Sequence, residues 1–301
     1  MKPGMVSAWV MAARPKTLWA SIAPVVIGTA MAFHFGRVDV ASLFAALLGG
    51  LLIQIGTNFA NDYFDFVKGT DTEERIGPAR ATQKGMVSPG TMRTAFLVVF
   101  ALVFVPGAYI LYRTSWPASL AGWIYLAIGL SSILFGILYT GGPMPLGYIG
   151  LGDVFVLVFF GPVAVCGTYY LHAAALPQVV VVAGLAPGLL SVALLAINNL
   201  RDVDQDRMAG KRTLAVRFGP EFARVEYLVC VFTGAFVIPM FLYGYTGVRW
   251  FALVPLVVLG LGYRAIRIAL KEKGPILNDV LASTGKMLLV FSVVFSLCWI
   301  L

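Results

Sequence analysis

Long apolar runs, separated by short stretches of Gly, Pro or charged residues, dominate this chain of 301 residues. Nine of the runs have about the 20 residues that an α-helix needs to cross a bilayer. Backbone polar groups in lipid must pair within the segment, so the runs are predicted to be helices. The strand alternation typical of a barrel is not seen. The expected spans are 18–35, 41–60, 94–113, 119–138, 153–171, 177–198, 222–244, 249–270 and 281–301.

The composition agrees with this pattern. The chain is 59% hydrophobic and 12% charged, with a mean hydropathy of +0.88, whereas soluble domains carry roughly 25% charged residues. We therefore expect an all-α integral membrane protein, with residues 1–301 forming a single transmembrane domain. The net charge of +8 does not indicate a nucleic-acid partner, because the basic residues lie between apolar spans and not on a soluble face.

The basic residues predict the orientation in the bilayer. With the N-terminus placed in the cytoplasm, only Arg37, Arg113 and Arg249 of the 22 Lys and Arg fall on the outer side. Such an excess of cytoplasmic Lys and Arg is typical of inner (plasma) membrane proteins of bacterial-type cells. Of the 14 acids, only Asp39 is placed outside. Acids contribute little to topology, so their gathering beside the bases on the cytoplasmic side indicates a site there.

Two acidic segments, 58–93 and 198–221, follow the second and sixth spans. In the first, Asn61 and Asp65 are four residues apart. In the second, the same spacing joins Asn198, Asp202 and Asp206. Side chains four residues apart share one face of a helix, so each segment presents an amide and carboxylates on one stripe. The recurrence indicates a weak internal repeat. Asp62 and Asp204 lie off the stripes, and Glu73, Glu74, Asp204 and Glu221 are interpreted as solvated loop charges.

Clustered carboxylates repel one another unless a cation joins them. Mg²⁺ favours oxygen ligands of this kind and commonly binds one or two carboxylates plus substrate phosphates. The same segments contain bases, which are the usual partners of phosphate oxygens. We therefore predict a magnesium–pyrophosphate site in which Asp65, Asp202 and Asp206 are the catalytic acids. The bases are Lys68, Arg75, Arg80, Lys84, Lys211 and Arg212.

A third cytoplasmic segment, LYTGGPMPLGYIGLGD, follows the fourth span. Tyr139, Tyr148 and Asp153 in this segment can line a pocket for an aromatic group. The alternative is that Gly and Pro form a turn and the tyrosines belong to the aromatic belt at the membrane interface. The sequence indicates no general base.

These segments resemble the UbiA superfamily of membrane prenyltransferases, over nearly the whole chain from ARPKTL to the last span. The specific parts are NDYFDFVKGTD, YTGGPMPLGYIGLGDVFVLVFFGPVAVCGTYY and NNLRDVDQDRMAGKRTLAVRFG. The superfamily often has an acid four residues after Asp65. Gly69 stands there in this chain and the third acid is Asp71, which departs from the 4-hydroxybenzoate branch and agrees with the naphthoate branch.

The resemblance implies a nine-helix UbiA-type bundle with a central cavity that opens sideways to lipid. It also implies transfer of a polyprenyl group from polyprenyl diphosphate to 1,4-dihydroxy-2-naphthoate, with loss of CO₂ and pyrophosphate, giving demethylmenaquinone. The implied ligands of two Mg²⁺ are Asn61, Asp65, Asn198, Asp202 and Asp206. The implied substrate-binding residues are Lys68, Arg80, Lys84, Lys211, Arg212, Tyr139, Asp71 and Asp62.

Two alternatives stay open. An enzyme of the same superfamily can use another acceptor, such as 4-hydroxybenzoate, homogentisate or a porphyrin, which an acceptor assay distinguishes. An ion-coupled transporter can also use intramembrane acids. It would move its substrate across the membrane without releasing pyrophosphate.

Overall fold

The chain is helical in the computed structural model, which describes residues 4–70 and 76–301 and contains no strand within those ranges. Five short 3₁₀ or π turns, at Pro15–Thr17, Phe159–Val163 (η2), Thr233–Val237, Arg249–Ala252 and Gly274–Ile276, connect or interrupt the α-helices. The α-helices are α1 (Met5–Ala13), α2 (Trp19–His34), α3 (Val40–Val67), α4 (Pro89–Leu102), α5 (Phe104–Arg113), α6 (Leu120–Leu138), α7 (Gly152–Val158), α8 (Ala164–Ala173), α9 (Gln178–Met208), α10 (Leu214–Phe218), α11 (Pro220–Phe232), α12 (Ile238–Thr246), α13 (Leu253–Lys271) and α14 (Leu277–Ile300).

The number of spans agrees with the sequence prediction. Eight helical stretches in the described ranges are long and apolar enough to cross a membrane, and the pair Val6–Thr17 and Trp19–His34, bent by 50°, gives a ninth if it counts as one span. The predicted span 18–35 corresponds to α2, which has 16 residues. The preceding α1 was not predicted, because a helix of nine residues is far shorter than the run that indicates a span.

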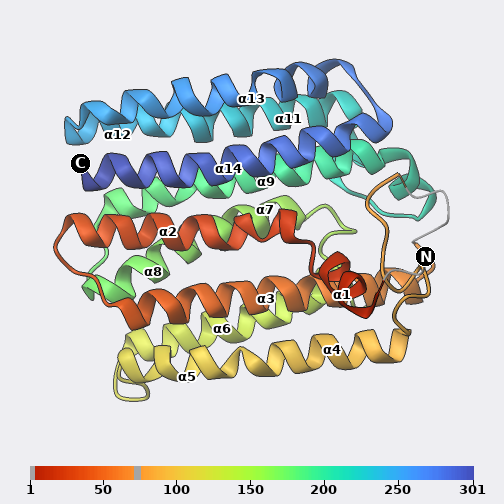
Figure 1. The fold of residues 1–301 in the computed structure, drawn as a ribbon, viewed down its shortest axis with the longest axis horizontal. Helices are drawn as coiled ribbons and strands as arrows, with labels where there is room; N and C mark the ends of the chain where they lie inside the picture. Colours follow the sequence, from red (N-terminus) through yellow and green to blue (C-terminus); the bar gives the residue numbers. More distant parts are fainter. Residues whose placement is uncertain (1–3, 71–75) are drawn as a thin grey trace.

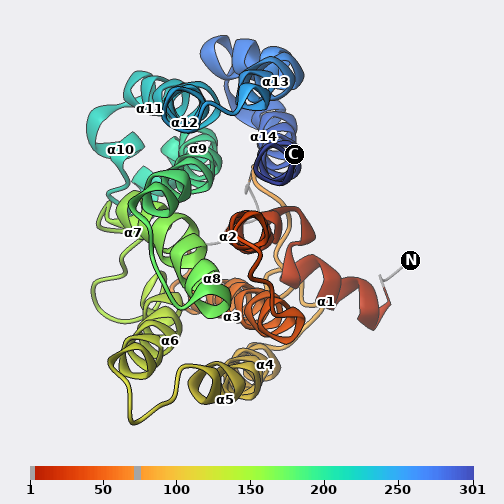
Figure 2. The ribbon, with the colours of Figure 1, turned by 90° about the vertical axis from the view of Figure 1, so that its left-hand side faces the viewer.

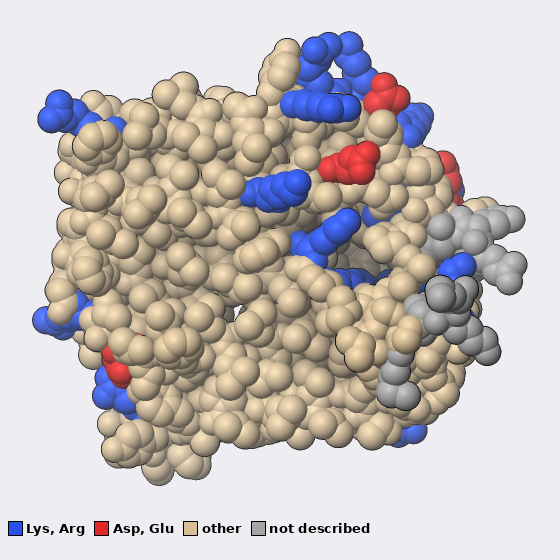
Figure 3. Space-filling view, viewed as in Figure 1, with Lys and Arg blue, Asp and Glu red and all other residues tan. Residues whose placement is uncertain are grey.

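Charged side chains lie toward the two ends of the molecule. On the face in Figure 3 they gather near the right-hand end, with a smaller group at the left edge and a broad uncharged band between them. An uncharged band is what a protein in contact with lipid presents to the hydrocarbon, where charges are costly. The chain is therefore an integral membrane protein.

The helices that carry the two acidic stripes are longer than predicted. The predicted spans 41–60 and 177–198 continue to Val67 in α3 and to Met208 in α9. Both helices end on the side of the molecule where the N-terminus lies, and the C-terminus lies at the opposite end (Figure 1). The polar residues can stay helical at these depths because they face protein and not lipid.

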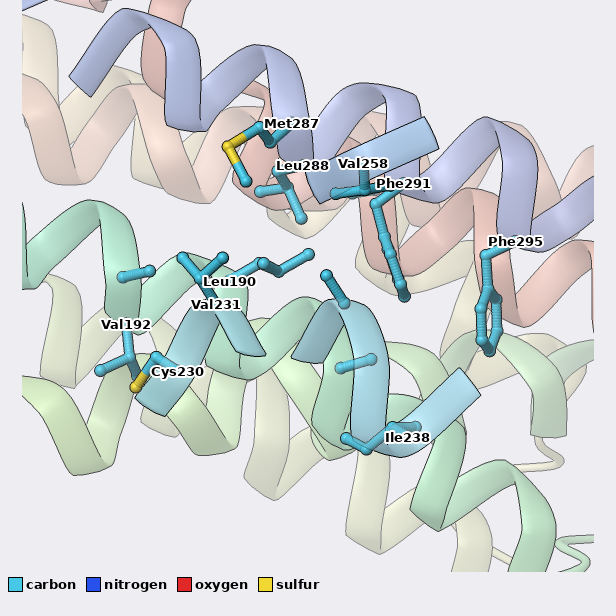
Figure 4. Packing of buried hydrophobic residues seen from close by; sticks show 14 of the residues in the cluster. Leu190, Val192, Cys230, Val231, Ile238, Val258, Met287, Leu288, Phe291 and Phe295 are labelled. Atoms are coloured by element: carbon cyan, nitrogen blue, oxygen red, sulfur yellow. The ribbon is translucent and has the colours of Figure 1, made fainter. Parts of the chain in front are cut away.

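Seen end-on, α2, α3 and α8 are neighbours in the middle of the bundle (Figure 2). On one side lie α4, α5 and α6, and on the other lie α11, α12, α13 and α14. The larger buried apolar cluster packs α9 against α11 and α14, as Figure 4 shows for Leu190, Val231 and Phe291. A smaller cluster, containing Phe59 and Phe96, joins α1, α3 and α4. The functional cavity described below lies between helices of these two clusters.

Glycine allows α9 to approach η2 closely. A Cβ atom on Gly188 would lie 2.6 Å from the carbonyl oxygen of Leu157 and 3.0 Å from the Cα of Gly161. Small residues permit this close backbone contact between membrane helices. Pro162, which lies inside η2, has no N–H to donate, and this favours the break in the helix at this contact.

Gly188→Ala is expected to destabilise the protein by about 1–3 kcal/mol, because the new methyl group must displace backbone atoms. The measurement is the thermal unfolding temperature of the detergent-solubilised protein. Gly260→Ala in α13 is the matched control. Nothing lies within 4 Å of its added Cβ, so it should be neutral or slightly stabilising through helix propensity. Equal unfolding temperatures for the two variants would contradict the close-packing interpretation.

Candidate functional site

Both acidic stripes lie near the C-terminal ends of α3 and α9, on the side of the molecule for which the sequence predicts a cytoplasmic location. Asp65 is 2% exposed, and Asp202 and Asp206 are 6% and 7% exposed. The Asp204 side chain, by contrast, is 83% exposed and lies 3.6 Å from Arg207. The prediction that Asp204 points away from the second stripe is therefore confirmed. The buried acids need compensating charges or hydrogen bonds, because an uncompensated buried charge is costly.

In the first stripe, Asp65 is held from two loops. Arg80, in the segment between α3 and α4, places its Nη2 2.7 Å from Oδ2 of Asp65. Tyr148, in the segment between α6 and α7, donates its hydroxyl to Oδ1 at 2.7 Å. The amide oxygen of Asn61 accepts a hydrogen bond from the Thr140 hydroxyl at 2.8 Å. The stripe therefore joins α3 to both neighbouring loops.

Asp62 has a different environment from Asp65. Its two carboxylate oxygens accept the backbone N–H groups of Ala81 and Thr82 at 3.0 and 3.2 Å. These bonds fix the segment that carries Arg80. Asp62 thus holds the loop between α3 and α4 and thereby positions Arg80, the ion-pair partner of Asp65.

In the second stripe, Arg201 organises the acids. Its Nε and Nη2 lie 2.7 and 2.6 Å from the two oxygens of Asp202, and its Nη2 also donates to the amide oxygen of Asn198 at 2.9 Å. Its Nη1 donates to Asn278 of α14 at 2.9 Å. The sequence reasoning missed this residue. A signal was present, since an arginine within the last turns of an apolar helix needs a partner.

Lys211 connects the two stripes. Its ammonium nitrogen lies 3.2 Å from Oδ1 of Asp206 and 4.0 Å from Oδ1 of Asp65. The Tyr148 ring lies between two lysines, with Nζ of Lys211 4.8 Å and Nζ of Lys68 4.9 Å from its centroid. The carbonyl oxygen of Tyr148 also accepts the backbone N–H of Arg212 at 2.6 Å. Tyr148 therefore links the first stripe to the segment that follows α9.

Lys68 caps the first stripe. Its ammonium donates to the carbonyl oxygens of Thr140 at 2.6 Å and Gly142 at 3.1 Å. Burial lowers the pKa of Lys68; the charge of Asp65 opposes this effect and that of Lys211 adds to it. Two lysines and two acids thus share one small volume.

The remaining predicted residues lie at different depths. Lys84 and Arg212 have exposed side chains at the rim of the site, and Tyr139 lines the cavity. Asp71 lies outside the described residues, as does Arg75, so their predicted roles stay predictions.

A cavity of about 680 Å³ runs into the bundle from the stripes. Asn61 and Asn198 belong to both the stripes and the cavity wall. Away from them the walls are largely apolar, contributed mainly by α2, α3, α5, α6, α7, η2, α8 and α9. Arg14 is the one charged side chain among the described residues that line it. Figure 3 shows a hollow near the same end of the molecule, with Lys and Arg at its edge. The arrangement suits a ligand with an anionic head and an apolar tail.

The donors of the stripes fit a hard divalent cation. Carboxylate and amide oxygens are suitable ligands for Mg²⁺, and the ammonium of Lys211 already places one positive charge between Asp65 and Asp206. Within residues 4–70 and 76–301, no three His, Cys, Asp or Glu side chains converge closely enough to bind a metal ion by themselves. Mg²⁺ characteristically completes its coordination with water and substrate phosphate oxygens, so the set fits the ion together with an anionic ligand.

Known proteins provide an independent comparison. Residues 21–278 match the UbiA prenyltransferase family. The 1,4-dihydroxy-2-naphthoate octaprenyltransferase of Escherichia coli (strain K12) is 43% identical over 231 residues, covering 76% of this chain and 74% of that protein. The protein of the same name from Mycobacterium tuberculosis is 37% identical over 295 residues, 94% of each chain. A solved UbiA homolog from Archaeoglobus fulgidus bound to GPP and Mg²⁺ has a TM-score of 0.66 at 16% identity, covering 97% of this chain and 99% of that one. This last likeness shows the fold.

Arg201→Gln is expected to destabilise the protein by about 3–5 kcal/mol, because it leaves the buried Asp202 carboxylate without its cation. Thermal unfolding in detergent measures the effect. The control is Arg207→Gln, whose side chain is 57% exposed and whose replacement should change stability by no more than about 0.5 kcal/mol. If the two variants unfold at the same temperature, Arg201 does not organise the second stripe.

Proposed function

The chain belongs to the UbiA prenyltransferase family, and from this premise we propose that it transfers a polyprenyl group from polyprenyl diphosphate to 1,4-dihydroxy-2-naphthoate. CO₂ and pyrophosphate are lost and demethylmenaquinone is formed in its reduced, quinol form. The observation that carries the proposal is the joining of Asp65 and Asp206 by Lys211 beside the polar end of a largely apolar cavity, where Asn61 and Asn198 line the wall. The names of the curated relatives supply the acceptor.

The diphosphate is proposed to bind between the two stripes. Mg²⁺ would be held by Asn61, Asp65, Asn198, Asp202 and Asp206, and when bound it would stabilise the charge that develops on the leaving pyrophosphate. The proposed phosphate-binding bases are Lys68, Arg80, Lys84, Lys211 and Arg212, and Asp71 is proposed to approach the same ligand. Asp62 contributes indirectly, because it positions the segment that carries Arg80.

Arg80 and Lys211 have two proposed roles. They contact acids of the stripes in this structure, and their donors are of the kind that binds phosphate oxygens. In the presence of Mg²⁺ the carboxylates would have the metal ion as their counter-charge, so Arg80 and Lys211 could bind phosphate oxygens instead. The buried charges would be balanced in both arrangements.

The apolar part of the cavity is proposed to hold the prenyl tail. Its walls include Phe104, Phe135, Phe155 and Phe159, which offer hydrocarbon contact and exclude water. Dry walls protect an allylic cation from hydrolysis after the carbon–oxygen bond breaks. The electron-rich ring of the acceptor then forms the new carbon–carbon bond.

The acceptor is proposed to bind at the polar end of the cavity. Tyr139 and Arg14 both line this end, and a guanidinium is well suited to a carboxylate such as that of the naphthoate. Other aromatic acids, including 4-hydroxybenzoate and homogentisate, also carry a carboxylate, so this contact alone does not select the acceptor. The choice of the naphthoate rests on the relatives.

The site is proposed to face the cytoplasm. The excess of Lys and Arg on the side of both acidic segments supports this orientation, with the N-terminus on the same side. We place the protein in the inner (plasma) membrane of a bacterial-type cell, acting as a single transmembrane domain over residues 1–301.

Incubation of the purified protein with Mg²⁺, farnesyl diphosphate and 1,4-dihydroxy-2-naphthoate should yield a prenylated naphthalenoid and pyrophosphate. Mass spectrometry of the lipid extract identifies the product, and parallel reactions with 4-hydroxybenzoate and homogentisate test the acceptor. Product from one of these and none from the naphthoate would overturn the choice of acceptor. Substrate flux into vesicles with no pyrophosphate release would favour the transporter.

Asp65→Asn and Asp202→Asn should each lower product formation by about 10²-fold or more, because each removes an anionic ligand that stabilises charge on the leaving group. EDTA should stop the wild-type reaction and added Mg²⁺ should restore it. Asp204→Asn, at the exposed neighbouring acid, is the matched control and should keep full activity. Full activity in both stripe variants would show that these acids do not hold the metal.

A further inference from the structure

Besides Asp62, two acids outside the stripes have a buried carboxylate oxygen. Asp153, at the start of α7, is 7% exposed, and the half-buried Glu226 lies in the second turn of α11. Within the described part of the chain, neither Oδ1 of Asp153 nor Oε2 of Glu226 has a hydrogen-bond partner, although both atoms are buried. Acids inside a membrane protein are costly and are characteristic of functional sites.

The two acids lie within electrostatic range of each other. Glu226 and Cys230, one helical turn apart on α11, both interact electrostatically with Asp153. Asp153 is therefore on the side of α7 toward this part of α11. The pair lies on the α7 and α11 side of the bundle, whereas the cations that hold the stripes come from α9 and from the segments following α3 and α9.

Tyr139 lies between this pair and the cavity. It lines the cavity, and its hydroxyl would lie 3.0 Å from a Cβ atom on Gly152, the residue next to Asp153. Burial raises the pKa of Tyr139, and Asp153 is the acid whose charge adds most to this effect. The tyrosine therefore keeps its proton and can accept one hydrogen bond while donating another.

Helix stabilisation does not explain these acids. Asp153 is in the first turn of α7, where a carboxylate interacts favourably with the helix dipole. That interaction needs no buried oxygen, since a solvent-exposed carboxylate in the first turn of a helix is also stabilised by it. It also gives no reason for Glu226, which lies inside α11 and faces the same acid.

We propose that Asp153 and Glu226 form a proton-holding pair that serves the acceptor through the Tyr139 hydroxyl. The inference rests on the proposed function, and it identifies the base that accepts the proton of the acceptor's ring hydroxyl. Tyr139 is the residue that touches the acceptor, and Asp153 and Glu226 act through it.

The proton movements balance in two steps. In the first, the ring carbon that carries the carboxylate bonds to the C1 carbon of the prenyl chain, the bond from this C1 carbon to the diphosphate oxygen breaks, and pyrophosphate leaves. A ring hydroxyl passes its proton to Tyr139 while Tyr139 passes its own to Asp153. In the second, the bond from the ring to the carboxylate breaks and releases CO₂. The electron pair returns to the ring, and the proton returns to the ring oxygen by the same route.

The test compares kcat and KM of the full-length protein with farnesyl diphosphate, 1,4-dihydroxy-2-naphthoate and Mg²⁺. Asp153→Asn should lower kcat by about 10²-fold and leave KM for farnesyl diphosphate unchanged. Asp153→Glu, which keeps a carboxyl group, should recover most of the activity. Glu226→Gln should give a smaller loss, and the exposed acid variant Asp204→Asn should give none.

A double-mutant cycle separates a relay from a structural role. Tyr139→Phe removes one oxygen atom and should lower kcat about as much as Asp153→Asn. The double variant should be no slower than either single variant, because groups that act as one unit are non-additive. If Asp153→Asn does not fold, the loss in Tyr139→Phe together with recovery in Asp153→Glu still tests the pair.

The outcomes distinguish the two proposals. A wild-type protein that forms no prenylated naphthalenoid refutes the proposed function. An active wild type with unchanged kcat in Asp153→Asn refutes the proton-holding pair alone, as do additive losses in the double variant.

Discussion

The structure depends on one constraint, which is that carboxylates buried at the end of a membrane helix must be balanced by cations. Asp65, Asp202 and Asp206 are almost inaccessible to solvent, and an unpaired charge in such a place costs several kcal/mol. Each acid draws its cation from a different part of the chain. Arg80 comes from the segment after α3, Arg201 from α9 itself and Lys211 from the segment after α9. Charge balance thus holds the segments that follow α3 and α9 against the two acidic stripes.

Part of this site follows from the sequence and part does not. Four-residue spacing predicted the two stripes, and it correctly separated Asp204 from Asp202 and Asp206 because periodicity alone decides which helix face a residue takes. The four-residue spacing did not reveal Arg201, since adjacent residues on a helix do not normally face each other. Arg201 reaches Asp202, the next residue, because its long side chain folds back along the helix. The hydrogen bonds of Asp62 to the backbone of Ala81 and Thr82 depend on the path of the loop after α3, and the pattern of residues along the sequence does not specify that path.

The same distinction applies to the fold. Hydrophobic length predicted the spans, because the bilayer sets that length. The predicted spans ended before α3 and α9 do, because the polar residues at the ends of these helices stay helical when they face protein. The helix α1 is too short for hydrophobic length to predict it, and tertiary contacts stabilise it. Trp9 packs on Phe59 with ring centroids 5.4 Å apart, and Asn58 donates to the carbonyl oxygen of Ala13 at 2.9 Å.

The acids of this protein therefore fall into two kinds that suit opposite tasks. Asp65 and Asp202 each contact a guanidinium or an ammonium. Such an acid has no oxygen placed to take a proton from an acceptor, but it can exchange one cation for another. An acid with a buried oxygen and no cation beside it, as Asp153 has, offers a place for a proton and none for a phosphate-bound metal. Prenyl transfer to a hydroxylated ring needs both tasks within one cavity, because it releases an anion and moves a proton. Placing the two kinds of acid on different helices, with Tyr139 in the wall between, keeps the proton away from the leaving pyrophosphate.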